Sequence, residues 1–421
     1  MDRGLSIAVV GAGPGGLATA LMLKQRGHHV TVFERFEKAA PLGSGLILQP
    51  TGLTVLDQLG LLPRILKRGA RIDRLTGADC RTGRTVLDVR YDALRGHRFG
   101  LGTHRAALFD VLHQAVLDAR IPLMTGTEAQ TLQEMGDGIG FDAGPLRFGP
   151  FDLVVDASGA RSVLRRHARK PIDPRPLRYG AVWATLDWKG GDFDPNALQQ
   201  RYERAHTMVG VLPIGAVEPG GSAKAAFFWS LKPADYDAIK DAGLAAWKKR
   251  VMDVWPQCVP YLDQIEDFEQ LTLARYGHHT MTRPRGNQVV FIGDAAHSTS
   301  PQLGQGANMA LLDAAALDHA LHRSETISDA LDRYGDLRRG HLRLFQALSL
   351  TLTPFYQSDG RVLPWLRDTL ISVSSRVPPV PQLMGTMVAG TLLNPLNRLE
   401  LLEPDWRKAR ELMASDQPLT T

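Results

Sequence analysis

Runs of consecutive apolar residues mark the places where the chain is predicted to form buried strands. The first run, Ser6–Val10, leads directly into a glycine-rich turn, and the helical pattern that follows ends near Gly27. A second strand is predicted at His29–Phe33 and ends at Glu34. Strand, glycine turn, helix and strand in this order are typical of a βαβ unit, so we predict a parallel sheet at the start of the chain.

The pattern changes in the middle of the chain. Helices are predicted at residues 51–59 and 105–119. A further helix is predicted at Leu244–Val254, and alternating, aromatic-rich runs around it predict strands at residues 181–188, 207–212, 225–231 and 271–276. Residues 288–292 return to the buried-strand pattern, and a long helical part follows them. We therefore predict a second, sheet-based domain inserted between two parts of the first.

The composition excludes several classes of protein. The chain has 421 residues, 44% hydrophobic and 22% charged, which is ordinary for a globular protein of two or three domains. A net charge of 49 − 44 = +5 is small for this length and favours an anionic small ligand over nucleic acid. Cys80 and Cys258 form no CxxC pair and no metal-ligand spacing is present, so we expect reduced thiols, a cytoplasmic protein and no metal site.

One apolar segment raises the question of membrane contact. Residues 377–397 contain no charge over 21 positions, but they include four prolines and two glycines. These helix breakers argue against a spanning helix. We predict a packing flap or the wall of a substrate tunnel, with shallow membrane contact as the alternative.

The glycine turn after the first strand has the spacing of a dinucleotide-binding fingerprint. Gly11 permits the tight turn, Gly13 lets the backbone approach a pyrophosphate, and Gly16 allows the helix to pack closely on the strand. Glu34 lies 18 residues beyond Gly16, where its carboxylate can accept hydrogen bonds from ribose hydroxyls. The cofactor-binding residues predicted in this part are Gly11, Gly13, Pro14, Gly15, Gly16, Glu34 and Arg35.

A second candidate site begins where the strand at residues 288–292 ends. Asp294 follows that strand and can accept hydrogen bonds from a polyol. Gly304 and Gly306 expose backbone N–H groups at the start of a helix, whose dipole would stabilise negative charge developing on a flavin. We predict cofactor contacts here from Asp294, Gly304, Gly306, Ala307 and Asn308.

Two motifs of the chain resemble those of the FAD-dependent aromatic hydroxylases, the group A flavoprotein monooxygenases related to para-hydroxybenzoate hydroxylase. They are Gly11-Ala12-Gly13-Pro14-Gly15-Gly16 and Gly293-Asp294-Ala295-Ala296-His297 with Pro301 and Gly304-Gln305-Gly306-Ala307-Asn308. The resemblance spans roughly residues 5–340 and implies FAD as the cofactor. It also implies cofactor contacts from Arg105 at a helix start, from Gly45 and Leu46 in a loop beside the flavin, and from Gly159.

Pattern and resemblance together predict an α/β fold. Residues 1–175 and 280–340 would form a Rossmann-type FAD-binding domain, residues 176–279 an inserted, mostly antiparallel β-sheet domain that binds substrate, and residues 341–421 a helical C-terminal part. The resemblance implies that the chain hydroxylates an aromatic or conjugated apolar small molecule through a flavin C4a-hydroperoxide, with NAD(P)H as electron donor. Pro301 is the implied catalytic residue, because in the family this proline lies beside the flavin and its carbonyl polarises the substrate.

One position departs from the family's pattern. The family's central motif ends a strand with Ala-Asp-Gly, whereas here Ser158 stands before Gly159. Because that motif contacts both FAD and NAD(P)H in the family, Ser158 favours an alternative, a desaturase, reductase or halogenase that receives electrons from a partner reductase. Residues 183–188 do not match the W-x-W-x-I-P pattern of the halogenases. A non-catalytic flavoprotein is a third alternative.

Aromatic residues of the inserted domain are candidates for the substrate pocket. Packing in the sheet core is the alternative for each of Tyr179, Trp183, Phe227, Phe228, Trp229 and Tyr276. His206, His278 and Tyr276 are candidates for a general base by their location only. The apolar tail over residues 349–402 suggests a bulky, lipophilic substrate or packing that closes the pocket.

Overall fold

A computed structural model describes residues 4–38, 44–360, 362–374 and 377–415. One layer is a five-stranded sheet in the order β20-β12-β1-β2-β8, in which every neighbouring pair is parallel. Its strands are β1 (Ser6–Val10), β2 (His29–Phe33), β8 (Leu123–Met124), β12 (Leu153–Asp156) and β20 (Val289–Phe291). Strands from distant parts of the chain therefore end side by side at one edge of this sheet.

Both faces of the parallel sheet are covered, which explains its continuously apolar strands. Ile7 of β1 lies in a core shared with the helices α1 (Pro14–Gln25), α4 (Arg105–Asp118) and α8 (Gly306–His322). Val10 lies in a second core with Phe33 and Phe141, whose ring centroids are 4.9 Å apart. Phe141 belongs to a three-stranded antiparallel sheet that the sequence pattern did not indicate, made of β9 (Thr131–Met135), β10 (Gly138–Ala143) and β11 (Leu146–Phe151).

The second large sheet has seven strands in the order β18-β14-β17-β16-β15-β5-β6. Only the pair β5 and β15 is parallel among its described strands. The strands are β5 (Arg74–Asp79), β6 (Thr85–Arg90), β14 (Gly180–Asp187), β15 (Ala197–Glu203), β16 (Thr207–Ala216), β17 (Ala223–Leu231) and β18 (Thr272–Ala274). The predicted fold class is confirmed. The division into domains stays a prediction, because β5 and β6 precede residue 176 and the sheet crosses that boundary.

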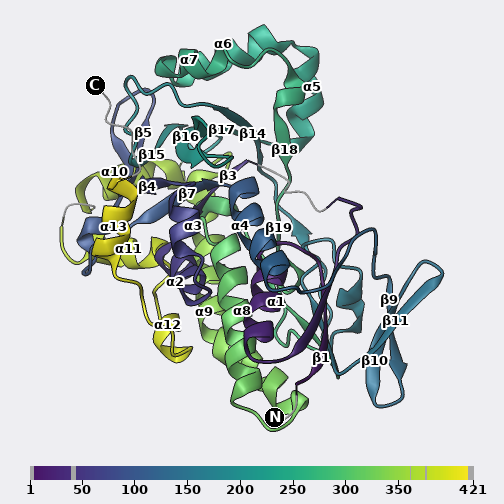
Figure 1. Cartoon of the computed structure of the whole chain (residues 1–421). Coiled ribbons are helices and arrows are strands. Elements are labelled where there is room, and N and C mark those ends of the chain that lie inside the picture. Colours follow the sequence, from purple (N-terminus) through teal and green to yellow (C-terminus); the bar gives the residue numbers. More distant parts are fainter. Residues whose placement is uncertain (1–3, 39–43, 361, 375–376, 416–421) are drawn as a thin grey trace.

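The two faces of the seven-stranded sheet have different neighbours. Its outer face buries Trp247 with Phe227 and Trp229, beneath the helices α5 (Tyr236–Asp241), α6 (Leu244–Val254) and α7 (Val259–Leu262) (Figure 1). Its inner face carries Phe228, which shares a core with Ile47 of a small sheet made of β3 (Gly45–Leu48), β4 (Ala70–Ile72) and β7 (Gly100–His104). The inner face of the large sheet therefore packs against this small sheet.

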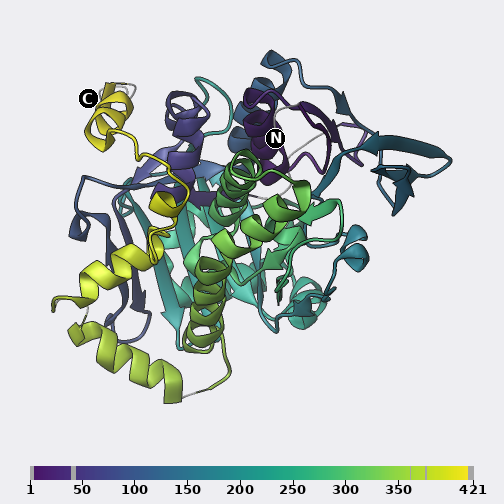
Figure 2. The same ribbon diagram turned by 90° about the horizontal axis from the view of Figure 1, so that it is seen from below.

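Helices follow the second motif to the end of the described chain. The long helix α9 (Ile327–Tyr356) packs on α8, and α10 (Val362–Ser374) and α11 (Val380–Val388) contact β6. In Figure 2 the C-terminal helices, yellow-green to yellow, lie along one side of the molecule. The last two are α12 (Pro395–Arg398) and α13 (Trp406–Ser415), and shorter elements elsewhere are α2 (Pro50–Gln58), α3 (Leu62–Leu66), β13 (Arg175–Pro176), β19 (Gly277–Thr280) and β21 (His297–Ser298). None of the helices described combines the length and the apolar character that crossing a membrane requires.

Candidate functional site

Three glycines shape the turn after β1. Gly11 has a φ of +106°, and a Cβ atom there would lie 2.5 Å from the carbonyl oxygen of Ala157. A Cβ atom at Gly16 would overlap the carbonyl oxygen of Gly11, so α1 approaches β1 this closely only with glycine at that position. At Gly13, a Cβ atom would meet no atom within 4 Å. Gly13 thus faces open space at the N-terminus of α1, where the pyrophosphate is predicted.

Glu34 holds the same turn from the end of β2. Its buried carboxylate accepts hydrogen bonds from the backbone N–H groups of Ala12 (2.8 Å) and Phe36 (3.1 Å). One bond falls on each oxygen, so lone pairs are left for ribose hydroxyls. Arg35 is exposed, and its guanidinium lies 4.6 Å from the ring centre of Phe36.

At the end of β12, a turn closes on the buried Asp156. Ser158 donates its hydroxyl hydrogen to Asp156 Oδ1 (2.6 Å), and Ser162 donates to the other carboxylate oxygen. Burial raises the pKa of Asp156, although these hydrogen bonds oppose the change. Gly159 follows with no atom within 4 Å of its Cβ position. The Ser158 side chain is therefore turned into the protein, while Gly159 faces open space.

Asp294 lies just after β20, in the short 3-10 turn η6 (Gly293–Ala295). Its side chain is exposed, although Gly293 and Ala295 on either side are buried. Desolvation by the surrounding protein nevertheless raises the pKa of the Asp294 carboxyl, against the opposing charges of His297 and Arg105. An exposed carboxylate at the end of β20 can accept hydrogen bonds from polyol hydroxyls.

Behind η6 lies a buried ion pair that the sequence analysis did not identify. Asp313 of α8 accepts hydrogen bonds from Gly293 N (2.8 Å), His297 Nε2 (2.6 Å) and Arg338 Nε (2.6 Å). Burial alone would raise the pKa of Asp313, but His297 and Arg338 outweigh it and lower that pKa to about 2. An aspartate within the apolar run of α8 was the available signal, since a buried carboxylate requires a partner.

The loop over residues 301–308 continues this edge of the site. Pro301 is exposed and begins the 3-10 turn η7 (Pro301–Leu303), and its carbonyl oxygen accepts a hydrogen bond from Gly304 N (2.9 Å). A Cβ atom at Gly306 would meet no atom within 4 Å, and Ala307 is half-buried. Pro301 and Gly306 therefore both lie at an accessible surface.

The side chain of Asn308 holds neighbouring backbone segments together, a role that the sequence analysis did not predict. Its Oδ1 accepts from Gln49 N (2.8 Å), and its Nδ2 donates to the carbonyls of Ile47 (3.1 Å) and Gly304 (2.9 Å). The side-chain nitrogen of Gln49 is buried without a partner among the described residues and lies 3.7 Å from the Cβ position of Gly304. The sequence analysis missed Gln49, which offers a free hydrogen-bond donor next to this loop.

Three more predicted cofactor residues have packing roles. Pro14 is the first residue of α1, and a Cβ atom at Gly15 would lie 3.1 Å from that of Ala310 in α8. A Cβ atom at Gly45 would lie 2.6 Å from that of Ala226, so Gly45 lets β3 pack on the inner face of the large sheet. Leu46 is half-buried beside it, and Gly43, the first residue of the loop expected to pass beside the flavin, lies outside the described residues.

Arg105 lies between the start of β3 and the second motif. It is the exposed first residue of α4, and its backbone N–H donates to the carbonyl of Ser44 (2.9 Å). Its charge opposes the rise that burial causes in the pKa values of both Asp294 and Tyr276, so the guanidinium lies in their electrostatic neighbourhood. Arg105, for which the resemblance implies a cofactor contact, thus lies near the second motif.

The aromatic candidates separate onto two faces of the seven-stranded sheet. Phe227 and Trp229 pack in the outer core, whereas Trp183 and Phe228 lie on the inner side with ring centroids 4.6 Å apart. Trp183 Nε1 donates a hydrogen bond to Tyr276 Oη (3.0 Å). Tyr179 donates to Asp359 instead, at 2.7 Å. Trp183, Phe228 and Tyr276 are therefore the three that the structure brings together.

The three general-base candidates do not share one place. His206 is bonded to the neighbouring Thr207 hydroxyl (2.9 Å), and His278 lies in β19, where burial lowers its pKa. Burial also raises the pKa of Tyr276, so this residue stays protonated at neutral pH. Tyr276 can donate a hydrogen bond to a ligand but is not a base at neutral pH.

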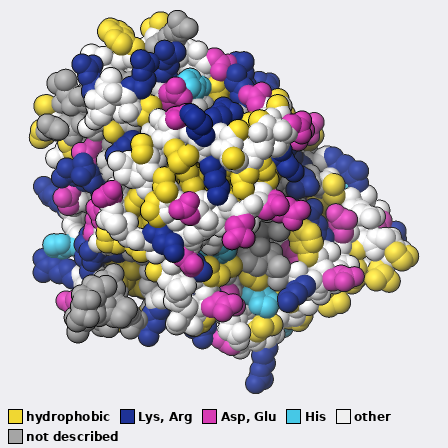
Figure 3. Space-filling model, turned by 90° about the horizontal axis from the view of Figure 1, so that it is seen from above, with side chains coloured by type: hydrophobic (Ala, Val, Ile, Leu, Met, Phe, Trp, Pro, Cys, Tyr) yellow, Lys and Arg dark blue, Asp and Glu magenta, His cyan; other side chains and the backbone are white. Residues whose placement is uncertain are grey.

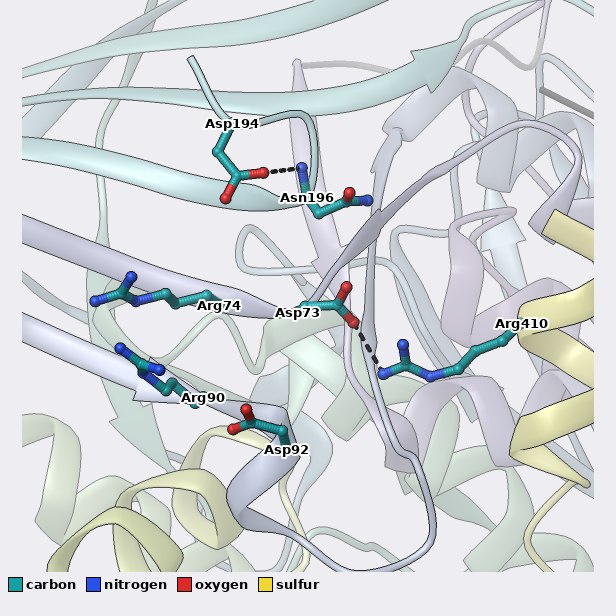
Figure 4. A pocket seen from close by; sticks show the side chains of 7 residues that line it. All are labelled: Asp73, Arg74, Arg90, Asp92, Asp194, Asn196 and Arg410. Carbon is teal, nitrogen blue, oxygen red and sulfur yellow. Dashed lines mark hydrogen bonds and ion pairs between the residues drawn. The ribbon is translucent and has the colours of Figure 1, made fainter. Parts of the chain in front are cut away.

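A charged pocket elsewhere on the molecule involves none of these residues. It has a volume of about 430 Å³ and is lined by Asp73, Arg74, Arg90, Asp92, Asp194, Asn196 and Arg410 (Figure 4). Arg410 pairs with Asp73 (2.9 Å) and Arg74 with Asp88 (2.7 Å). Figure 3 likewise shows Lys and Arg interspersed with Asp and Glu over one face, as the small net charge predicts.

The open positions lie at one edge of the parallel sheet. Gly13, Gly159 and Asp294 follow the carboxyl ends of the neighbouring strands β1, β12 and β20, the edge at which doubly wound sheets bind cofactors. Open space at Gly13, Gly159 and Gly306, the exposed carboxylate of Asp294 and the free donor of Gln49 fit an elongated cofactor with phosphate and polyol groups, such as FAD.

Comparison with known proteins identifies the family. Residues 5–345 match the FAD binding domain family. The chain is 27% identical over 407 residues to 6-methylpretetramide 4-monooxygenase of Streptomyces rimosus, covering 91% of this chain and 92% of the relative. It is 30% identical over 364 residues to 3-amino-4-hydroxybenzoate 2-monooxygenase of Streptomyces cremeus, covering 80% and 84%. The structure of Klebsiella pneumoniae HpxO with FAD and uric acid has the same fold, with a TM-score of 0.77, 20% identity, and coverage of 92% of this chain and 98% of that one. The chain therefore binds FAD and belongs to the FAD-dependent monooxygenases of the FAD binding domain family.

Proposed function

We propose that this monooxygenase hydroxylates an aromatic or conjugated apolar small molecule, with NAD(P)H as the electron donor. Substrate would bind against the strands that the proposed substrate domain (176–279) contributes to the large sheet, between the FAD-binding part (1–175 and 280–340) and the helical part (341–421). FAD would be held by Gly11, Gly13, Pro14, Gly15, Gly16, Glu34, Arg35, Gly45, Leu46, Arg105, Gly159, Asp294, Gly304, Gly306, Ala307 and Asn308.

The position of Trp183 and Phe228 carries this proposal. Their rings lie 4.6 Å apart on the face of the sheet that packs against Ile47, next to the loop proposed to pass beside the flavin. Flat aromatic surfaces favour planar apolar ligands, and a dry site strengthens the polar contacts within it. One relative is named for 3-amino-4-hydroxybenzoate, an aromatic acid, which supports the same substrate class.

The chain's own groups would orient the substrate. The Pro301 carbonyl accepts one hydrogen bond from Gly304 and keeps a second lone pair, with which it could accept from a substrate hydroxyl. The Tyr276 hydroxyl accepts from Trp183 and keeps its own proton for donation. When bound, FAD supplies the electron transfer and O2 activation for inserting one oxygen atom, while the second leaves as water.

A turnover experiment tests the proposal. The FAD-loaded enzyme is mixed with NADH or NADPH in air and with phenols, hydroxybenzoates or hydroxyquinolines, and nucleotide oxidation and product mass are measured. We expect at least one compound to accelerate nucleotide oxidation and to gain one oxygen atom, with Trp183→Leu raising KM more than it lowers kcat. Absence of flavin reduction by either nucleotide with every compound would contradict it.

Ser158 favours the second candidate, an enzyme that receives its electrons from a partner reductase. Residue 158 is a serine, so the turn has no carboxylate at this position. The Ser158 hydroxyl donates a hydrogen bond to Asp156. Photoreduced enzyme separates the two candidates, because it bypasses the nicotinamide. An oxygenated product from photoreduced enzyme, without flavin reduction by NADH or NADPH, would support the partner-dependent monooxygenase.

A further inference from the structure

The C-terminal end of α11 is held by side chains from three other elements. The carbonyl oxygen of Val388 accepts from Gln305 Nε2 (2.7 Å), that of Ala389 from Thr51 Oγ1 (3.4 Å) and that of Gly390 from His341 Nε2 (2.9 Å). The last carbonyls of a helix have no partner within the helix and are often left to water. Here three successive carbonyls bind groups that lie far away in sequence.

Gln305 connects this helix end to the FAD site. It stands between Gly304 and Gly306, in the loop proposed to lie along the flavin, and its side chain is 2% exposed. The position of Gly306 faces open space, whereas the Gln305 amide points away to Val388. The conformation of the loop therefore depends on a carbonyl that belongs to the C-terminal segment.

Hydrogen bonds also connect His341 to Gly293, at the start of the second FAD motif. Its Nδ1 lies 3.1 Å from Arg338 Nη1, and because the guanidinium only donates, Nδ1 must accept and Nε2 must carry the proton given to Gly390. Arg338 in turn binds Asp313, which holds Gly293 N at 2.8 Å. His341 is 2% exposed, and burial with the Arg338 charge lowers its pKa to about 3, so it is neutral.

We propose that His341 is a positioning residue for the FAD site, which docks the segment formed by Val388, Ala389 and Gly390 against the loop that contains Gln305. Arg338 fixes the tautomer with which His341 holds Gly390. Docking and FAD binding are then coupled, and the coupling is reciprocal: FAD stabilises the docked segment by the factor by which docking tightens FAD. His341 would have this role with any substrate, because it acts on the cofactor loop.

Two variants of His341 test the positioning role. His341→Phe keeps an aromatic ring beside Phe345, now 4.7 Å away between centroids, but removes both nitrogen atoms. His341→Gln keeps an acceptor for Arg338 and a donor for Gly390. We expect His341→Phe to weaken FAD binding roughly tenfold and to change the visible spectrum of the bound flavin, and His341→Gln to restore both.

A matched control separates positioning from general destabilisation. Val251→Ala removes packing from the outer core of the large sheet, where Val251 is fully buried in a cluster that contains none of the residues proposed to hold FAD. It should lower the melting temperature without changing FAD affinity or the flavin spectrum. Equal weakening of FAD binding by Val251→Ala and His341→Phe at matched loss of stability would overturn the proposal.

Hydrogen exchange in the wild-type chain tests the coupling even if His341→Phe does not fold. The N–H groups of Ala389, Gly390 and Thr391 donate to carbonyls of the same helix end, so their exchange reports its docking. We expect added FAD to slow their exchange several-fold, alongside that of residues 304–308. Protection of residues 304–308 without any at 389–391 would show that the segment and the FAD site are independent.

Discussion

Ser158 is bonded to Asp156 through two groups, its hydroxyl at 2.6 Å and its backbone N–H at 2.9 Å, both on Oδ1. Asp156 is fully buried, so a second carboxylate at position 158 would lie beside it away from water, where the two negative charges repel each other. We expect Ser158→Asp to lower the free energy of unfolding by about 1–3 kcal/mol at pH 7, with partial recovery towards pH 5 as the pair takes up a proton.

Ser158→Ala serves as the control for that variant. It removes the hydroxyl without adding charge and should cost about 1 kcal/mol with no recovery at lower pH. Urea unfolding at both pH values measures the difference. A Ser158→Asp protein as stable as the wild type would mean that the new side chain turns outward.

Gly13 and Gly16 should respond differently to the same substitution. Gly13→Ala adds a methyl group into open space at a φ of −72°, so the FAD-free chain should keep its melting temperature while FAD binding weakens at least tenfold. Gly16→Ala brings its methyl group against the Gly11 carbonyl and should destabilise the chain with or without FAD. Thermal melts and FAD titrations distinguish the two, and equal effects of both variants would contradict the assignment of open space to Gly13.

The raised pKa of Asp294 makes its carboxylate unfavourable for folding. Because the folded pKa lies above the unfolded one, ionisation at neutral pH opposes folding, and this penalty disappears below the unfolded pKa. We expect Asp294→Asn to leave the FAD-free chain at least as stable at pH 7 and to weaken FAD binding by about 1.5–3 kcal/mol, the value of a hydrogen bond to a charged group. A stable Asp294→Asn protein with unchanged FAD affinity would show that Asp294 does not contact the cofactor.

Because His279 and His341 are buried, we expect the free energy of unfolding to fall in mild acid. Burial lowers the pKa of His279 to about 4 and that of His341 to about 3, so both are neutral in the fold but protonated in the unfolded chain below about pH 6.5. The free energy of unfolding should therefore fall as pH drops from about 6.5 to about 4, by up to about 1.4 kcal/mol per pH unit for each group. Asp313 does not titrate in this window, because its pKa is about 2. His279→Gln should reduce the slope measured by urea unfolding between pH 7 and 5, and an unchanged slope would exclude His279 as a contributor.

Local geometry explains what the sequence predicted well. The requirement for glycine at positions 11 and 16 follows from the turn itself, and the helix predicted at residues 105–119 is α4, Arg105–Asp118. The lack of an apolar run explains what it missed. Strand β9, Thr131–Met135, has no such run and is a strand because it pairs with β10 in a hairpin.

Side-chain roles in the site were predictable only where a single turn decides them. Gly13 faces the open edge because α1 begins there, whereas Asn308 is a brace because Gln49 comes to it from 259 residues away. Gly45 likewise owes its place to Ala226 on the large sheet. The role of Pro301 beside a substrate stays a prediction, since the structure shows its exposure and its bond to Gly304 alone.

The order of strands in the parallel sheet has a consequence for biosynthesis. The FAD edge needs β1, β12 and β20 together, and the last residues of β12 and β20 are 291 − 156 = 135 positions apart. At ribosomal rates of about 5–20 residues per second, roughly 7–27 s pass between the synthesis of these two strands. During that interval the edge of β12 that β20 will occupy is open, so the nascent chain carries an unpaired, apolar strand edge until β20 arrives.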